Sequence, residues 1–417
     1  MIEPIRKDRE NGFARLLAHG GCYADKTGLI RKLFDECGGP FVFGRPPGFG
    51  KTLLLDAIQM VAEGDPVPFS GLEIGKPDSG HKWKSYPVIR IDMKDIDPDP
   101  DGFDSSLSSE LRRIRDGFGL ESSPDRELYD LGDLLFEIAY RDVFAARARG
   151  EDEKGIPHLD SVVLVDNFDW HLTDFGAEPK SAERIWHKLL HFFTLIKACS
   201  EHVEMAFIAG VSRFMLVTIF GGMNTKNDIC LDDSYAALCG ITRNELLSAF
   251  AGPLDAALSA LKRSGEFGQD ATAEDLADRL EEWYGGYSFD GRTRLINPGS
   301  LAAFLEHASF RDYWSLSSAP VLLRRLGLGS GDYKAAHGKD LLLGTHYPDI
   351  NEDRRLTSTQ ALTLAGCLAV GREDDRHGMM PSFYHLTIPN REIREAVHAA
   401  EASGAAPARG PRKPKRP

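Results

Sequence analysis

The sequence lacks the features that mark membrane-bound and exported proteins. No apolar run approaches the roughly 20 residues that cross a bilayer, and the N-terminal stretch MIEPIRKDRENG is charged where a signal peptide has an apolar core. The six cysteines form no CxxC pair and have no spacing typical of a zinc site, so we expect reduced thiols. These absences predict a soluble, cytoplasmic protein with no membrane partner.

Basic residues are scarce outside the C-terminal tail. The 417 residues include 50 Lys and Arg against 63 Asp and Glu, a net charge of −13, and five of the basic residues lie in the last fifteen positions. The other 45 basic residues and the 63 acids give −18, which disfavours a general DNA-binding surface. The tail over 403–417 has no apolar content to fold around, so a disordered, solubilising tail is favoured over nucleic-acid binding through it.

Short apolar strands alternate with helices in the first 242 residues. The continuous apolar run at 162–165 is typical of a strand buried on both faces. The pattern predicts an α/β fold whose mostly parallel sheet is covered on both sides. The predicted strands lie at 40–43, 86–92, 162–165 and 205–209. Helices are predicted at 53–63 and 181–199, with two or three more over 103–148.

A glycine-rich turn follows the first strand and precedes a helix. Residues 44–52 read GRPPGFGKT, which is close to the Walker A phosphate loop. Loop amides and the helix N-terminus would bind the anion, Lys51 would reach the terminal phosphates, and the Thr52 hydroxyl would bind Mg²⁺. Arg45 stands where the strict pattern has its first glycine, so a turn capping an ordinary helix stays open as an alternative. The predicted nucleotide-binding residues here are Arg45, Gly48, Phe49, Gly50, Lys51, Thr52 and Leu53.

An acid ends the strand at 162–165, where an ATPase of this kind holds Mg²⁺ through water. This acid is Asp166, and the next residue is Asn167 where many such enzymes have a glutamate that activates water. An amide cannot take a proton at neutral pH, so Asp169 is the nearby replacement base. We assign Lys51, Asp166, Asn167 and Asp169 to the catalytic centre, with Thr52 and Asp166 as the metal ligands.

Two weaker signals follow the strand at 205–209. Ser212 and Arg213 are candidate sensors of the terminal phosphate; the alternative is a helix cap beside a solvated arginine. Residues 225–228 read TKND, which fits the string with which GTPases recognise guanine, but the Asp-x-x-Gly of those proteins is absent after Asp166. A guanine-nucleotide-binding protein is therefore a disfavoured alternative.

Short motifs are spread over the chain from about residue 10 to residue 396. They are YADKTGLI at 23–30, RP at 45–46, FGKT at 49–52, DNFD at 166–169, GVSRF at 210–214, WYGGY at 283–287, NP at 297–298, YW at 313–314 and IPNREIR at 388–394. Together they resemble the AAA-ATPase-like family of bacterial proteins, which often carry a C-terminal PD-(D/E)XK nuclease-like domain. The resemblance implies ATP and Mg²⁺ as ligands and places 23–27 near the base. The family's own loop also has an arginine at the position of Arg45, which accounts for the missing first glycine. Nuclease activity is not implied, because no Asp…Glu-x-Lys arrangement follows residue 396.

We therefore predict an ATP-binding switch with weak or absent hydrolysis and an unidentified protein partner. A nucleotide-independent interaction scaffold is the alternative. The expected parts are a P-loop domain at 1–242, a helical lid at 243–345, a small α+β unit at 346–402 and a disordered basic tail at 403–417.

Overall fold

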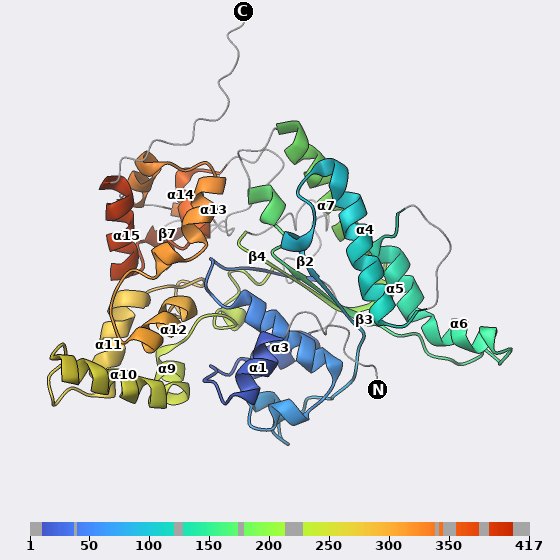
Figure 1. Ribbon diagram of the computed structural model, residues 1–417, viewed down its shortest axis with the longest axis horizontal. Helices are drawn as coiled ribbons and strands as arrows, with labels where there is room; N and C mark the ends of the chain where they lie inside the picture. The colour runs from blue at the N-terminus through green and yellow to red at the C-terminus, as the bar shows by residue number, and fades with distance from the viewer. Residues whose placement is uncertain are drawn as a thin grey trace, which may run out of the picture.

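The computed structural model has an α/β body with a helical part and a small antiparallel sheet at one end (Figure 1). None of the helices in the described chain is both long and apolar enough to cross a membrane. The structure describes residues 11–36, 40–120, 128–173, 179–212, 228–337, 342–344, 356–374 and 383–402.

The central sheet has four parallel strands in the order β1-β4-β3-β2. Gly44 pairs with Gly210 and Asp92 pairs with Asp166, so the carboxyl ends of the strands meet at one edge of the sheet. This confirms the predicted parallel sheet and places the phosphate loop and the acid on the same edge. The strands are β1 (Pro40–Gly44), β2 (Val88–Asp92), β3 (Ser161–Asp166) and β4 (Val203–Gly210).

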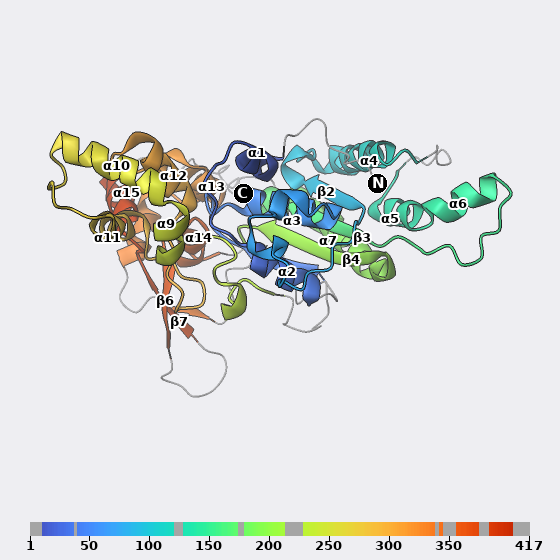
Figure 2. The same ribbon diagram turned by 90° about the horizontal axis from the view of Figure 1, so that it is seen from below.

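Helices cover both faces of this sheet. In Figures 1 and 2, α1 and α3 lie on one face, and α4, α5 and α7 lie on the other. All six residues of β3 are buried, as its apolar run predicts. The helices are α1 (Gly12–Ala18), α2 (Thr27–Asp35), α3 (Lys51–Glu63), α4 (Pro100–Gly117), α5 (Leu131–Ala139), α6 (Arg141–Ala148) and α7 (Pro179–Ala198).

Four further helices pack around a second hydrophobic core. The helical segment that starts at Arg243 is divided into two helices at Phe250. Pro253 gives the physical reason, because proline lacks an N–H and its ring clashes with the carbonyl four residues earlier. These helices are α9 (Arg243–Ala249), α10 (Ala251–Ser264), α11 (Ala273–Tyr284) and α12 (Pro298–His307).

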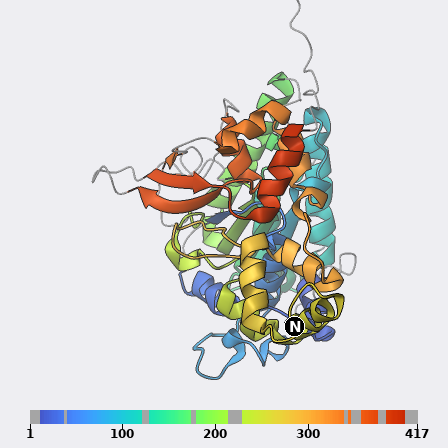
Figure 3. The same cartoon turned by 90° about the vertical axis from the view of Figure 1, so that its left-hand side faces the viewer.

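The C-terminal part contains a small α+β unit of the kind predicted, but its elements begin before the predicted start at residue 346. Its strands form an antiparallel sheet in the order β5-β7-β6, and Figure 3 shows β6 and β7 beside α15. Its buried residues belong to the same core as the parallel sheet, not to the second core. The elements are α13 (Ala319–Arg325), the 3₁₀ segment η9 (Ser330–His337), β5 (Leu342–Gly344), α14 (Ser358–Leu364), β6 (Ala369–Asp374), β7 (Phe383–Thr387) and α15 (Arg391–Ala402).

Glu392 joins two of the short motifs, IPNREIR and YW, to each other and to Ser300 of α12. Its buried carboxylate accepts hydrogen bonds from Ser300 Oγ (2.9 Å), Tyr313 N (2.8 Å) and Trp314 N (2.9 Å). Burial raises the pKa of Glu392 to about 7, although these hydrogen bonds oppose the shift. The YW and IPNREIR motifs therefore hold the C-terminal part together and contribute no residue to the site described next.

Candidate nucleotide-binding site

The phosphate loop turns from β1 into α3 at the carboxyl edge of the sheet. Gly48 (φ +83°) and Gly50 (φ +85°) adopt the left-handed backbone that favours glycine. No side chain in the described part of the chain caps the start of α3. The first N–H groups of this 13-residue helix are therefore available to an anion, and the helix dipole adds to the attraction.

Lys51 is the first residue of α3, and its side chain is buried. Its Nζ donates to the carbonyl oxygens of Arg45 (2.7 Å) and Pro46 (3.0 Å). Burial lowers the pKa of Lys51 to about 8 from the ordinary 10.5, while Asp166 and Asp169 oppose the shift. A phosphate would add negative charge beside this ammonium and would favour its protonated form.

Thr52 and Asp166 meet although 114 residues separate them. Thr52 Oγ1 donates to Asp166 Oδ2 at 2.8 Å, and Asp166 is fully buried. Arg90 lies 3.5 Å from the same oxygen and 3.3 Å from Asp56. A hydroxyl and a carboxylate side by side are oxygen ligands of the kind that Mg²⁺ prefers, so the donor set fits the expected metal.

Asn167 has the left-handed backbone (φ +51°), which asparagine tolerates better than most residues. Its N–H donates to Asp166 Oδ1 at 2.9 Å, and its amide Nδ2 donates to Asp92 Oδ1 at 2.9 Å. Asp92 ends β2 and is also buried. The position that often holds a catalytic glutamate is thus occupied by an amide that is hydrogen-bonded to a neighbouring carboxylate.

Asp169 faces the end of β4. Its Oδ2 accepts from Val211 N (2.9 Å) and Ser212 N (2.6 Å). Burial raises the pKa of Asp169, and the hydrogen bonds from Ser212 and Val211 act against that rise. The carboxylate is therefore held in place, with its second oxygen outside these two bonds.

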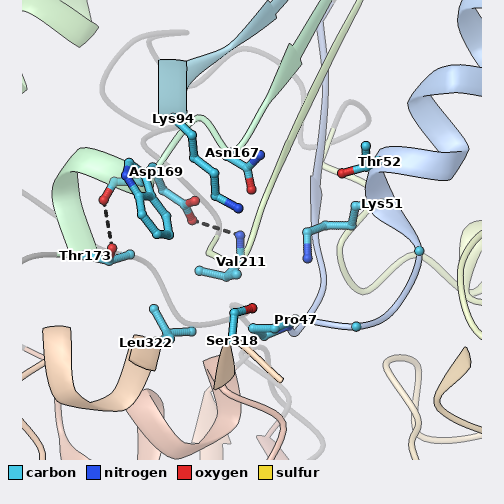
Figure 4. Close-up of a pocket in the computed structure, with 13 residues that line it drawn as sticks. Pro47, Lys51, Thr52, Lys94, Asn167, Asp169, Thr173, Val211, Ser318 and Leu322 are labelled. Atoms are coloured by element: carbon cyan, nitrogen blue, oxygen red, sulfur yellow. Dashed lines mark hydrogen bonds between the residues drawn. The ribbon is translucent and has the colours of Figure 1, made fainter. Parts of the chain in front are cut away.

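One cavity of about 360 Å³ brings together six of the twelve predicted residues, and Asp166 lies behind its lining, hydrogen-bonded to Thr52 (Figure 4). In Figure 4, Lys51 and Lys94 extend into it from opposite sides. Leu322 of α13 and Ser318, which directly precedes that helix, close the side that faces the C-terminal part. Its lining comprises Pro47, Gly48, Gly50, Lys51, Thr52, Lys94, Asn167, Asp169, Trp170, Thr173, Val211, Ser318 and Leu322.

Lys94 and Trp170 are the site residues that the sequence reasoning missed. Lys94 lies two residues beyond the end of β2, and its Nζ is 4.7 Å from the centre of the Trp170 ring. Arg325 of α13 lies 3.8 Å from the centre of that ring and donates to the Trp170 carbonyl at 2.8 Å. The rule that ligands bind at the carboxyl ends of parallel strands would have indicated Lys94, whereas no sequence signal pointed to α13.

A second cavity of about 250 Å³ is largely apolar and shares Gly50 with the first. Phe49 and Leu53 line this cavity and not the first one. The segment at 23–27 contributes Tyr23, Ala24 and Lys26, and Lys26 forms an ion pair with Glu245 of α9 at 2.5 Å. Further lining residues are Leu16, Cys22, Leu54, Leu238, Cys239, Gly240, Ile241, Phe250, Pro298, Leu301 and Ala302.

Arg45 lines neither cavity. Its fully buried guanidinium donates to the carbonyls of Gly44 (2.8 Å) and Cys230 (2.7 Å). The Cζ atom of Arg45 lies 4.3 Å from the centre of the Phe43 ring and 3.9 Å from the centre of the Phe289 ring. This arrangement favours a structural role over the predicted contact with a terminal phosphate. It also attaches the loop to the segment that precedes α12.

The remaining predicted residues contribute less. Ser212 is fully buried and lines neither cavity, and Arg213 lies outside the described residues. Of the TKND string, only Asp228 is described. It bridges to Val42 and accepts from Cys230 N at 3.1 Å, away from both cavities. This placement gives no support to the guanine interpretation.

The strand order, the Gly-Lys-Thr start of α3 and the acid at the end of β3 define a P-loop protein of the ATPase type. The profile of the family described as "Predicted AAA-ATPase" matches residues 11–220, about half of the chain. The chain belongs to this AAA-ATPase-like family, which confirms the resemblance stated above.

An uncharacterized protein encoded in the vnfD 5′ region of Azotobacter chroococcum mcd 1 is 28% identical to this chain over 385 residues. The match covers 91% of this chain and 66% of that protein, so the chain spans slightly less than two thirds of its relative. Among solved structures, the Aeropyrum pernix ORC1 protein in complex with DNA matches over 96% of this chain and 94% of its own, at 13% identity. Its TM-score of 0.27 is too low to support any conclusion.

Proposed function

We propose that this protein binds ATP together with Mg²⁺ and works as a nucleotide-gated switch with weak hydrolysis. The hydrogen bond between Thr52 and Asp166 is the observation that carries the proposal, because it joins the phosphate loop to the acid at the end of β3. Lys51 and the amides at the start of α3 would hold the phosphates. Thr52 and Asp166 would hold Mg²⁺, which when bound would neutralise phosphate charge.

Lys94 would hold the terminal phosphate from the side opposite Lys51. Both ammonium groups reach into the same cavity, and Lys94 extends from the turn directly after β2 (Figure 4). Its contact with the Trp170 ring orients the side chain without neutralising its charge. Lys94 would therefore contribute more to the binding of ATP than to that of ADP.

The apolar cavity would take the base. It begins at Gly50, where the phosphate cavity ends, and Tyr23, Leu53 and Ile241 supply aromatic and aliphatic surface. Pro298 and Leu301 of α12 form part of the same wall. A nucleotide that spans both cavities would therefore contact the sheet domain and the helical part together.

Weak hydrolysis follows from the side chains beside the acid. Asn167 cannot accept the proton of an attacking water, and its amide is engaged with Asp92. Asp169 is the nearest alternative base within the cavity, but two backbone N–H groups hold one of its oxygens. We therefore expect the protein to retain ATP for longer than a fast ATPase would.

The lid contacts explain how binding could be transmitted. Gly48 accepts a hydrogen bond from Gly299 N at 3.1 Å, so the phosphate loop contacts the start of α12 directly. Arg325 links α13 to Trp170 on the far wall of the cavity. A shift of the loop or of Trp170 on nucleotide binding would therefore alter the position of the C-terminal elements, where an unidentified protein partner could detect it.

A nucleotide titration tests the proposal. Fluorescent analogues of ATP, ADP and GTP are titrated with and without Mg²⁺ against wild type, Lys51→Ala and the exposed control Lys82→Ala, which lines neither cavity. We expect ATP to bind more tightly with Mg²⁺, Lys51→Ala to abolish tight binding and Lys82→Ala to match wild type. If wild type binds no nucleotide, the alternative of a nucleotide-independent scaffold replaces the switch.

A further inference from the structure

A cluster of potential metal ligands lies in the C-terminal part of the chain. His337 ends η9, and His398 and Glu401 stand three residues apart on α15. One ligand atom from each of the three lies within 4.8 Å of the other two. None of these residues lines the nucleotide cavities.

We propose that His337, His398 and Glu401 form a site for a divalent transition metal ion of the zinc class. Two imidazoles and one carboxylate are a donor set that zinc uses, with a water in the fourth position. Bond lengths of about 2.0–2.1 Å place two tetrahedral ligands about 3.3 Å apart. His337 Nε2 lies 3.3 Å from Glu401 Oε1, and His398 Nδ1 lies 3.9 Å from Glu401 Oε2.

The small excess in the second distance can be removed by rotation. The side chains of His337 and His398 are 37% and 62% exposed, so no packed neighbour fixes either ring completely. Glu401 is 21% exposed and extends from a helix that is anchored at its other end by Glu392. The carboxylate is thus the fixed ligand, and the two imidazoles can adjust to it.

Glu401 supplies an independent reason for a cation here. Its Oε1 is buried and has no hydrogen-bond partner of good geometry among the described residues. Buried polar atoms in folded proteins are almost always satisfied. A cation held between Glu401 and the two histidines would satisfy this oxygen and join the end of η9 to the last turn of α15.

The competing explanation is an ion pair between Glu401 and a protonated histidine, and it predicts no affinity for zinc. The test uses untagged full-length protein, freed of metal with a chelator and titrated with Zn²⁺ against a competing indicator. The visible absorption of bound Co²⁺ reports the coordination geometry independently. Variants are His398→Ala and Glu401→Gln, and the control is His191→Ala, an exposed histidine on α7 with His187 one helical turn before it.

We expect one zinc ion per chain in wild type. Both site variants should lose about tenfold or more in zinc affinity, because even the loss of a residue that only supports a metal ligand lowers the affinity by about that factor. Zn²⁺ should raise the melting temperature of wild type and His191→Ala but not of the site variants. Equal melting temperatures without metal would show that all variants fold. The proposal is overturned if wild type binds no zinc, or if His191→Ala lowers the affinity while His398→Ala and Glu401→Gln do not.

Discussion

Replacing Thr52 by valine tests the contact on which the proposed function depends. Valine keeps the shape of threonine and removes only the hydroxyl, which donates to buried Asp166 at 2.8 Å. A hydrogen bond to a charged group contributes about 1.5–3 kcal/mol. Asp166 keeps the N–H of Asn167 at 2.9 Å and the nearby Arg90 at 3.5 Å, so we expect a loss of unfolding free energy of about 1.5–2 kcal/mol.

The effect of Thr52→Val on ligand binding should be selective. Lys51 and the helix amides remain, so the affinity for ATP without Mg²⁺ should stay within about twofold of wild type. The additional affinity that Mg²⁺ gives to wild type should largely disappear, because the hydroxyl is one of the two proposed protein ligands of the metal. The variant thereby separates phosphate binding from metal binding.

The assay is a pair of titrations with a fluorescent ATP analogue, with Mg²⁺ and with EDTA, together with urea unfolding. Thr194→Val is the matched control, because Thr194 is exposed on α7, its Oγ1 donates to the Leu190 carbonyl at 2.8 Å, and it lies outside both cavities. A wild-type response to Mg²⁺ in Thr52→Val would refute the metal assignment. A loss of ATP binding in EDTA as well would show that the hydroxyl serves the loop and not the metal.

Three further predictions concern charged groups. The double variant Asp92→Asn/Asn167→Glu should release phosphate faster than either single variant and up to ~10²–10⁴-fold faster than wild type, because residue 167 then supplies a carboxylate base and still pairs with an amide at residue 92. Equal steady-state rates of phosphate release would contradict this. The pKa of Lys51 is about 8 in the folded protein against an ordinary 10.5, so the unfolded chain holds more protons between these two pH values. From pH 8 to 10.5, the free energy of unfolding of wild type in urea should therefore rise by about 3 kcal/mol relative to that of Lys51→Met. A difference between the two proteins that does not change with pH would argue against a buried ammonium. The pKa of Glu392 is about 7 in the folded protein against an ordinary 4.5, so the folded chain holds more protons between these two pH values. As the pH rises from 4.5 to 7, the free energy of unfolding of wild type, monitored by tryptophan fluorescence, should fall by about 3 kcal/mol relative to that of Glu392→Gln. Parallel pH profiles would show that Glu392 ionises normally.

The sequence was sufficient to predict the sheet domain, because its signals are local. A buried parallel strand reads as an apolar run, and β1, β2, β3 and β4 each begin and end within two residues of the predicted strand limits. Gly50, Lys51 and Thr52 are contiguous, and Asp166 directly follows its strand. Parallel pairing then brings the carboxyl ends together, so the loop and the acid could be placed in one site before the structure was known.

Burial changed the interpretation of residues that the sequence could only classify by charge. Arg45 and Lys51 are both cations of the phosphate loop, yet the guanidinium of Arg45 lies between Phe43 and Phe289, whereas Lys51 borders the cavity. Phe289 is more than 240 positions away from Arg45, and no local pattern records that contact. A charge motif therefore identified the loop, but it could not show which of its cations faces a ligand.

The sequence by itself determined the order of the strands along the chain, the phosphate loop and the acid, because hydrophobic period and short contiguous motifs specify them. Only the tertiary structure decided what surrounds them. It brought Lys94, Trp170 and Ser318 to one cavity, paired Asn167 with Asp92, and joined the scattered C-terminal motifs at Glu392. These contacts depend on the packing of segments that are remote in the chain, and packing leaves no local trace in the sequence.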